Sequence, residues 1–130
     1  RDAQESRGLG DVYKRQGNDL DIYSGNDDQV IPILSLGGIG VISVLSNVRP
    51  AAVHDMVMEY LNGNIKSALD IQLKYLDLIE ALFCEVNPIP VKAAMKLLGY
   101  DVGGLRLPLT ELEDANRARL KESMESLKEN

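Results

Sequence analysis

Two short apolar runs that flank one helical stretch, within residues 20–45, constrain the fold of this chain more than any other feature. The first run ends at Ser24 and is followed by a polar turn, which is typical of a strand end. The second run, over residues 41–45, is continuously apolar and rich in β-branched residues, as in strands buried on both faces. Between them, residues 29–36 have the apolar composition of a buried helix. We therefore predict a β-α-β unit whose strands are parallel and joined by a right-handed crossover.

Parallel strands require further strands beside them and helices on both faces, and two strands are too few. The rest of the chain supplies only helical patterns, because apolar residues recur there every three or four positions. We predict a helix from Pro50 to the residue before Gly63, and one long helix over residues 65–86. A third helix is predicted over residues 91–98, and a fourth begins at a capping box of Thr110 and Glu113 and extends to about Lys128.

The first sixteen residues show neither a strand period nor a helix period. We interpret residues 1–16 as a frayed terminus or foreign sequence and exclude them from the fold. The chain begins with Arg1 instead of methionine, so we expect it to be the end of a longer protein.

Composition excludes several classes of function. The chain has 20 Asp and Glu against 14 Lys and Arg, a net charge of −6, which disfavours binding to nucleic acid and to anionic membranes. No apolar run approaches the roughly 18 residues of a membrane span, and the first residues lack the basic flank and apolar stretch that are typical of a signal peptide. Cys84 is the single cysteine, so an internal disulfide is impossible and a reducing cytoplasm is the expected location.

Few side chains are candidates for catalysis. His54 and Asp55 are adjacent on a predicted helix, where neighbours point about 100° apart, so we expect a partly exposed histidine that does not face its neighbour. Cys84 lies in an apolar stretch and is expected to be a buried, unreactive thiol. Lys92 and Lys96 lie four residues apart on one helix, but nothing nearby would lower an amine pKa. We expect both lysines to be solvated, as we do Lys14.

The turns around the two strands are more informative. Asp27 and Asp28 could pair as carboxylates, but an acidic turn before a helix more often caps that helix. The glycine-rich residues 37–40 precede a strand instead of following one, so they do not form a phosphate cradle. Because ligands collect at the carboxyl ends of parallel strands, residues 24–26 and 44–47 are the candidate wall of a site.

Four segments resemble the dihydrodipicolinate synthase family in order and spacing across about residues 18–130. They are Tyr-Ser-Gly-Asn-Asp-Asp at 23–28, Leu-Gly-Gly-Ile-Gly-Val-Ile-Ser-Val at 36–44 with Ser46-Asn47 after it, Glu-Val-Asn-Pro-Ile-Pro-Val-Lys at 85–92, and Leu-Arg-Leu-Pro-Leu at 105–109. The resemblance implies an α/β fold, the C-terminal portion of a TIM (β/α)₈ barrel with its last two strands, followed by a helical appendage. Residues 17–48 would form the last β-α-β unit, and residues 49–130 the final barrel helix and the helical region.

Family members condense pyruvate with aspartate semialdehyde in lysine biosynthesis through a Schiff base on a lysine, with a tyrosine, a threonine and an arginine assisting. The resemblance places all four of these side chains upstream of Arg1, so we predict that this chain alone is inactive. It implies no cofactor and no metal, a cytoplasmic location and a homotetramer.

Three substrate-binding residues carry over from the resemblance. Gly25 would leave room beside the pyruvate-derived carbon, and the backbone carbonyl of Ile42 would face the pyruvate. Asn87 would approach the barrel mouth from the appendage.

Two alternatives remain open. The chain could belong to an aldolase similar to N-acetylneuraminate lyase, which shares the fold and acts on another acceptor, although the acidic turn at 25–28 and the loop at 87–92 resemble the synthase more. It could also be a non-catalytic module that uses the helices within residues 50–86 as a docking surface.

Overall fold

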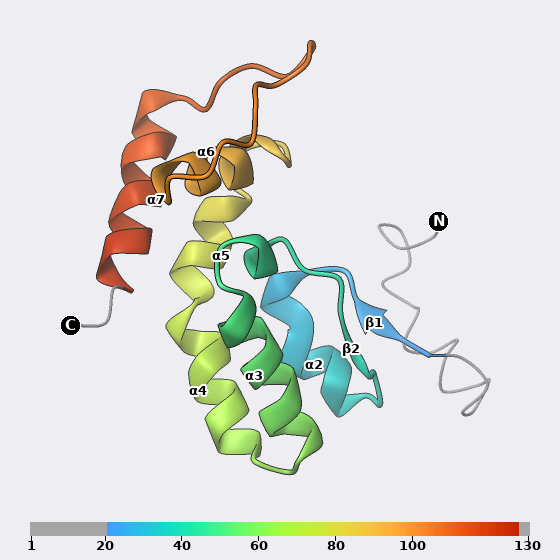
Figure 1. Cartoon of the computed structure of the whole chain (residues 1–130). Helices are drawn as coiled ribbons and strands as arrows, with labels where there is room; N and C mark the ends of the chain where they lie inside the picture. Colours follow the sequence, from blue (N-terminus) through green and yellow to red (C-terminus); the bar gives the residue numbers. More distant parts are fainter. Residues whose placement is uncertain (1–20, 128–130) are drawn as a thin grey trace.

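The computed structural model describes residues 21–127, which form two short strands and a layered set of helices (Figure 1). The lead 1–16, Lys14, Leu20 and Lys128 lie outside the described residues. The elements in chain order are β1 (Tyr23–Ser24), the 3₁₀ turn η1 (Asp27–Gln29), α2 (Val30–Ser35), β2 (Gly40–Val41), the 3₁₀ turn η2 (Leu45–Asn47), α3 (Pro50–Leu61), α4 (Ile65–Lys74), α5 (Leu76–Leu82), α6 (Ile89–Leu97) and α7 (Asp114–Ser126).

The two strands are parallel, as predicted, with α2 as the crossover helix between them. Tyr23 pairs with Gly40 and Ser24 with Val41, and the Ile42 amide donates to the Ser24 carbonyl oxygen at 2.8 Å. The prediction of a second strand over residues 41–45 is wrong in its length, since β2 ends at Val41 and η2 begins at Leu45. The apolar, β-branched composition of this segment favours a strand. It does not reveal that a carboxylate in the turn after β1 accepts hydrogen bonds from the backbone amides that would otherwise continue the second strand.

The long helix predicted over residues 65–86 is interrupted at Tyr75 and ends at Leu82. Its two parts, α4 and α5, lie in line along one side of the molecule (Figure 1). At Phe83 the backbone has φ −116° and ψ 12°. Its amide donates to the Glu80 carbonyl oxygen, three residues earlier, which is the 3₁₀ spacing that often ends helices. Apolar residues continue at the same period past this point, so the pattern alone predicts too long a helix.

The capping box at Thr110 is a second correction, because α7 begins at Asp114, three residues later than the box requires. In a capping box the Thr110 hydroxyl would accept from the amide of Glu113. That amide donates instead to the Glu85 side chain, Oε1, at 3.0 Å, and the Asn116 amide nitrogen donates to the same oxygen at 2.7 Å. Glu85 therefore caps α7 from the loop between α5 and α6.

Glu85→Ala is expected to lower the free energy of unfolding by about 1 kcal/mol, the usual effect of removing a helix cap. Glu85→Gln keeps an acceptor oxygen and is the matched control, with a smaller expected loss. Urea unfolding of the variants measures both values. Equal losses for the two variants would show that the charge, and not the cap geometry, stabilises α7.

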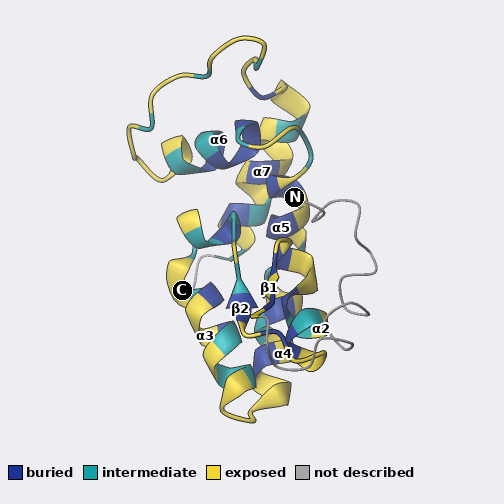
Figure 2. Ribbon diagram, turned by 90° about the vertical axis from the view of Figure 1, so that its right-hand side faces the viewer, coloured by how far each residue is buried: buried dark blue, intermediate teal, exposed yellow. Residues whose placement is uncertain are grey.

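The core links the strand unit to the helical region. One buried cluster joins Leu45 of η2 to residues of α5, α6 and α7, among them Leu78, Leu82 and Leu120, each with no exposed surface. Figure 2 shows buried segments along α5 and α6, while the long loop between α6 and α7 is mostly exposed. Within residues 21–127, no helix has the length and apolar character needed to cross a membrane.

Candidate functional site

The carboxyl ends of β1 and β2 bring two of the predicted substrate-binding residues together. Gly25 follows β1 and Ile42 follows β2, and the Ile42 amide is bonded to the residue before Gly25 at 2.8 Å. A methyl group added at Gly25 would meet no described atom within 4 Å, so this position faces open space. The Ile42 residue is 75% exposed.

The turn after β1 is held by the side chain of Ser24, the last residue of that strand. The Ser24 hydroxyl donates to the Asn26 carbonyl oxygen at 2.7 Å and accepts from the Asn26 amide at 3.2 Å. Ser24 is buried, so these two bonds form away from solvent and hold Gly25 between them. The residue at the end of the first strand therefore sets the path of the loop.

Asp27 contradicts the prediction that the acidic turn caps its own helix. No side chain caps η1 or α2 from the preceding residue, and Asp27 is only 2% exposed. Its carboxylate accepts from the Ser43 hydroxyl, from the Val44 amide at 2.9 Å and from the Leu45 amide at 3.0 Å. It thus caps the 3₁₀ turn after the second strand, because a buried carboxylate is best stabilised by several donors.

Gln72 is a residue of this site that the sequence analysis missed. It lies on α4, is 5% exposed, and donates from Nε2 to the Asp27 carbonyl oxygen at 2.8 Å. Its Oε1 accepts from the Ile31 amide at 3.4 Å, in the first turn of α2. A signal was present: Gln72 follows the buried Ala68 by four residues, and a polar residue on a buried helix face needs a partner.

Asn87 lines a depression that includes neither Gly25 nor Ile42. It precedes α6 with a cis peptide bond to Pro88, and it lines an open depression of about 300 Å³. Asn47 and Val44, which follow β2, line the same depression, so the structure brings Asn87 to the carboxyl end of the second strand. The other lining residues are Pro88, Val91, Lys92, Met95 and Val102.

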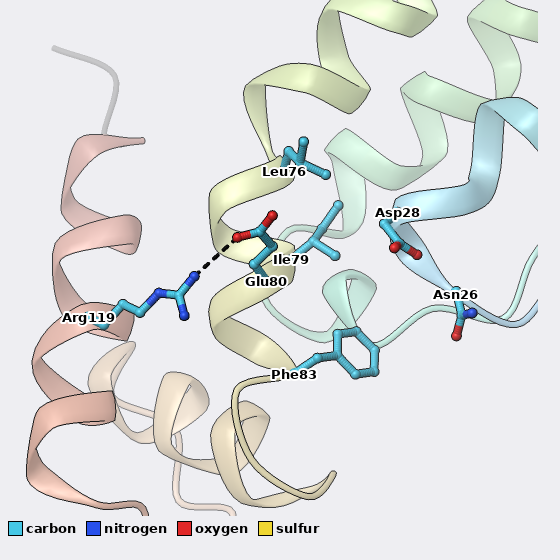
Figure 3. Close-up of a pocket in the computed structure, with 7 residues that line it drawn as sticks. All are labelled: Asn26, Asp28, Leu76, Ile79, Glu80, Phe83 and Arg119. Atoms are coloured by element: carbon cyan, nitrogen blue, oxygen red, sulfur yellow. Dashed lines mark hydrogen bonds and ion pairs between the residues drawn. The ribbon is translucent and has the colours of Figure 1, made fainter.

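A second depression, of about 390 Å³, lies between the turn that follows β1 and helix α5 (Figure 3). Asn26 and Asp28 lie on one side of it, and four α5 or post-α5 side chains lie on the other. Arg119 of α7 also lines the depression and forms an ion pair with Glu80 of α5 at 3.2 Å. The remaining lining residues are Leu76, Ile79 and Phe83. Three of its seven lining side chains are apolar, and both members of its ion pair are exposed, so neither charged group is desolvated there.

The structure contradicts the prediction for the His54–Asp55 pair and agrees with an unreactive Cys84. The expectation that His54 and Asp55 do not face each other is wrong, because Nδ1 and Oδ1 lie 3.0 Å apart; adjacent side chains can bend towards each other where both are exposed. The prediction that Cys84 is buried is wrong in degree, because the residue is half-buried. Burial, then the nearby Glu85 carboxylate, raise the pKa of its thiol. A neutral thiol is a poor nucleophile, which agrees with an unreactive cysteine.

The lysines are held at the surface of the helical region. Lys92 donates to the Gly104 carbonyl oxygen at 2.6 Å, and Lys96 lies 3.7 Å from the Glu111 carboxylate. Neither contact desolvates an amine, so neither lysine is set up as a nucleophile. Among the residues described, no group of three or more His, Cys, Asp or Glu side chains is placed to hold a metal ion.

Comparison with known families finds a match to the model of the dihydrodipicolinate synthetase family over residues 3–127. This chain belongs to the dihydrodipicolinate synthetase family. The matched range begins within the lead 1–16 that the sequence analysis set aside. Dihydrodipicolinate synthetase family structures also match the fold, so the prediction of a partial TIM barrel with added helices is confirmed.

Individual relatives give the extent of the similarity. The chain is 60% identical over 105 residues to the 4-hydroxy-tetrahydrodipicolinate synthase of Clostridium tetani, covering 81% of this chain and 36% of the relative. The dihydrodipicolinate synthase structure from Aquifex aeolicus matches with a TM-score of 0.86 at 38% identity, covering 91% of this chain and 40% of the other. A structure described as a monomeric variant of dihydrodipicolinate synthase matches with a TM-score of 0.84 at 37% identity, covering 95% and 41%. The chain therefore spans little more than a third of the length of these relatives.

Proposed function

We propose that the complete protein, meaning this chain joined to the upstream segment that its relatives possess, condenses pyruvate with aspartate semialdehyde. The product would be 4-hydroxy-tetrahydrodipicolinate, an intermediate of lysine biosynthesis. Membership of the family over residues 3–127 is the observation that carries this proposal. The parallel pair β1 and β2, with its loops at the carboxyl ends, supports it, because barrel enzymes bind substrates at that end.

The chemistry is that of a class I aldolase. An upstream lysine amine attacks the pyruvate carbonyl, water leaves, and a protonated imine forms. The positive imine nitrogen accepts the electron pair that remains when the methyl group loses a proton. The resulting enamine carbon then forms a bond to the aldehyde carbon of the second substrate. An upstream tyrosine and threonine would relay the protons, and an upstream arginine would hold the semialdehyde carboxylate.

The part of this chain would be to bind and orient. Gly25 would leave space beside the pyruvate-derived carbon, which agrees with the open space around it. Ile42 would present its backbone carbonyl to the pyruvate, from a position hydrogen-bonded to the end of β1. Asn87 would contact substrate from the loop before α6, beside the residues that follow β2. No side chain of this chain is assigned a proton-transfer or covalent role, so the chain alone would be inactive.

The complete protein should consume pyruvate only when aspartate semialdehyde is present, as followed by loss of the pyruvate methyl signal in a proton nuclear magnetic resonance spectrum. The isolated chain should consume none. Consumption with an amino sugar aldehyde such as N-acetylmannosamine, and not with the semialdehyde, would replace this proposal with the sialic-acid-lyase-like aldolase. Absence of consumption with either acceptor would refute both.

The complete protein is also proposed to be a cytoplasmic homo-oligomer, a tetramer by family. An apolar stripe on α4 supports self-association: Ile65, Leu69 and Leu73 recur every four residues on one face and are 46%, 42% and 58% exposed. Exposed stripes of this kind mark interaction surfaces.

Leu73→Asp is expected to reduce the oligomer of the complete protein to a smaller species, because it buries a charge in the proposed contact. Light scattering after size-exclusion chromatography measures the mass. Ser67→Asp adds the same charge to a different face of α4 and should leave the mass unchanged. An unchanged mass for Leu73→Asp would place the contact elsewhere.

A further inference from the structure

A chain of hydrogen bonds connects the helical region to the end of the second strand. It begins at Gln72 on α4, passes through Asp27 in the turn after β1, and ends at the residues that follow Ile42. We propose that Asp27 is a positioning residue for the reaction: its carboxylate fixes the backbone after Ile42 and thereby sets the place of the Ile42 carbonyl. This inference rests on the function proposed above.

The Ile42 backbone is held on both sides. On its amino side, its own amide donates to the Ser24 carbonyl oxygen at 2.8 Å. On its carboxyl side, the next three residues all donate to Asp27, through the Ser43 hydroxyl and the Val44 and Leu45 amides. The Ile42 carbonyl lies between these two anchors, so the peptide unit that carries it has little freedom to rotate. This matters because the side chain of Ile42 is exposed and does not fix the residue by packing.

The carboxylate is suited to this task by its charge and burial. Both of its oxygens are used: Oδ1 accepts from Ser43, and Oδ2 accepts from Val44 and Leu45. Hydrogen bonds to an ionised group are stronger than those between neutral groups, and burial keeps water from competing. Removing the carboxylate would leave the Leu45 amide, in a fully buried residue, without this acceptor.

Asp27 is itself fixed from outside the strand unit. Gln72 is buried, donates to the Asp27 carbonyl oxygen at 2.8 Å, and accepts from the Ile31 amide at the start of α2. The same glutamine therefore holds the turn and the crossover helix. A helical region that supplies no catalytic group thus contributes to the geometry of the site through Gln72.

The test compares two substitutions of Asp27 in the complete protein, with KM for each substrate, kcat and the melting temperature measured together. Asp27→Ala is expected to raise KM for pyruvate about tenfold and to leave KM for aspartate semialdehyde within about twofold, since misplacing a binding group weakens the substrate it touches. Asp27→Asn keeps one oxygen for both amides and offers its nitrogen to the Ser43 hydroxyl, so it should restore KM for pyruvate to within about threefold of wild type. Asp70→Ala removes an exposed carboxylate from α4 and should change neither constant.

Four outcomes overturn the inference. A purely structural role would lower kcat and the melting temperature while both KM values stayed unchanged, because only the active fraction would fall. Where Asp27→Ala does not fold, Ser43→Ala decides: we expect KM for pyruvate to rise about threefold through loss of one anchor, and an unchanged KM contradicts the proposal. A wild-type protein that does not condense the two substrates overturns the proposed function and this inference together. An active wild type whose variants keep the same KM for pyruvate overturns the inference alone.

Discussion

Leu82→Ala should lower the free energy of unfolding by about 3 kcal/mol, within the usual range for a large-to-small change in a core. Leu82 has no exposed surface and lies in the cluster that joins η2, α5, α6 and α7. The loss has two sources, the transfer of fewer apolar atoms from water and the cavity left behind. Because four elements converge there, the surrounding side chains cannot collapse into the space without moving a helix.

The matched control is Leu61→Ala, at the last residue of α3, where the leucine is about half exposed. Truncation there removes little buried area, so the expected change is below about 0.5 kcal/mol. Urea unfolding followed by circular dichroism measures both variants. A loss for Leu82→Ala no larger than that for Leu61→Ala would show that the helical region does not share a packed core with the strand unit.

Gly38→Ala should lower the free energy of unfolding by about 2–3 kcal/mol, as overpacking does where the neighbours cannot move. A Cβ at this position would lie 2.6 Å from the Ile33 Cγ2 atom and 2.8 Å from the Ile33 carbonyl oxygen. The second atom belongs to the backbone of α2, and it already accepts from the Gly38 amide at 2.9 Å. The Ile22 carbonyl oxygen, at 3.2 Å, blocks the opposite direction. Relief therefore requires the end of α2 to move away from β1.

Gly104→Ala is the control for this glycine. A Cβ there would meet no described atom within 4 Å, and the residue is exposed in the loop before α7. We expect no loss of stability, or a slight gain from reduced freedom of the unfolded chain. A Gly38→Ala protein as stable as the Gly104→Ala protein would mean that the turn before β2 adopts another conformation.

The parts of the fold that were predictable are those fixed by local pattern. The parallel β-α-β unit follows from the apolar runs and the turn after Ser24, and the structure confirms it. Helices α3 and α6 lie close to their predicted ranges, because Pro50, Gly63 and Gly99 mark their ends in the sequence.

The parts that were not predictable depend on side chains far away in the sequence. Local caps were expected for α2 and α7, but Gln72 binds an amide in the first turn of α2, and Glu85 binds the amide of the residue just before α7. Asp27 was expected to cap the helix beside it, and it binds amides 17 and 18 residues further along. A donor buried by tertiary packing takes whichever acceptor the fold brings near, and sequence spacing does not show which one that is.

In the site, too, some features could be predicted from the sequence, and others depend on contacts between residues that are distant in the chain. The carboxyl ends of the strands were found from topology, and Gly25, Ile42 and Asn87 came from resemblance. Asp27 was noticed for its charge but given the wrong partner, and Gln72 was overlooked because its helix pattern looks ordinary. Only the three-dimensional arrangement shows that these two residues hold the segment that follows Ile42.

The central claim is that this chain forms one wall of a pyruvate site whose reactive amine lies upstream. Reduction with borohydride in the presence of pyruvate, followed by mass spectrometry of peptides, tests it most directly. The complete protein should carry one reduced pyruvate on a lysine that precedes residue 1 of this chain, and the 130-residue chain treated alone should carry none. A stable adduct on any lysine within the chain, or an unmodified complete protein, would contradict the account.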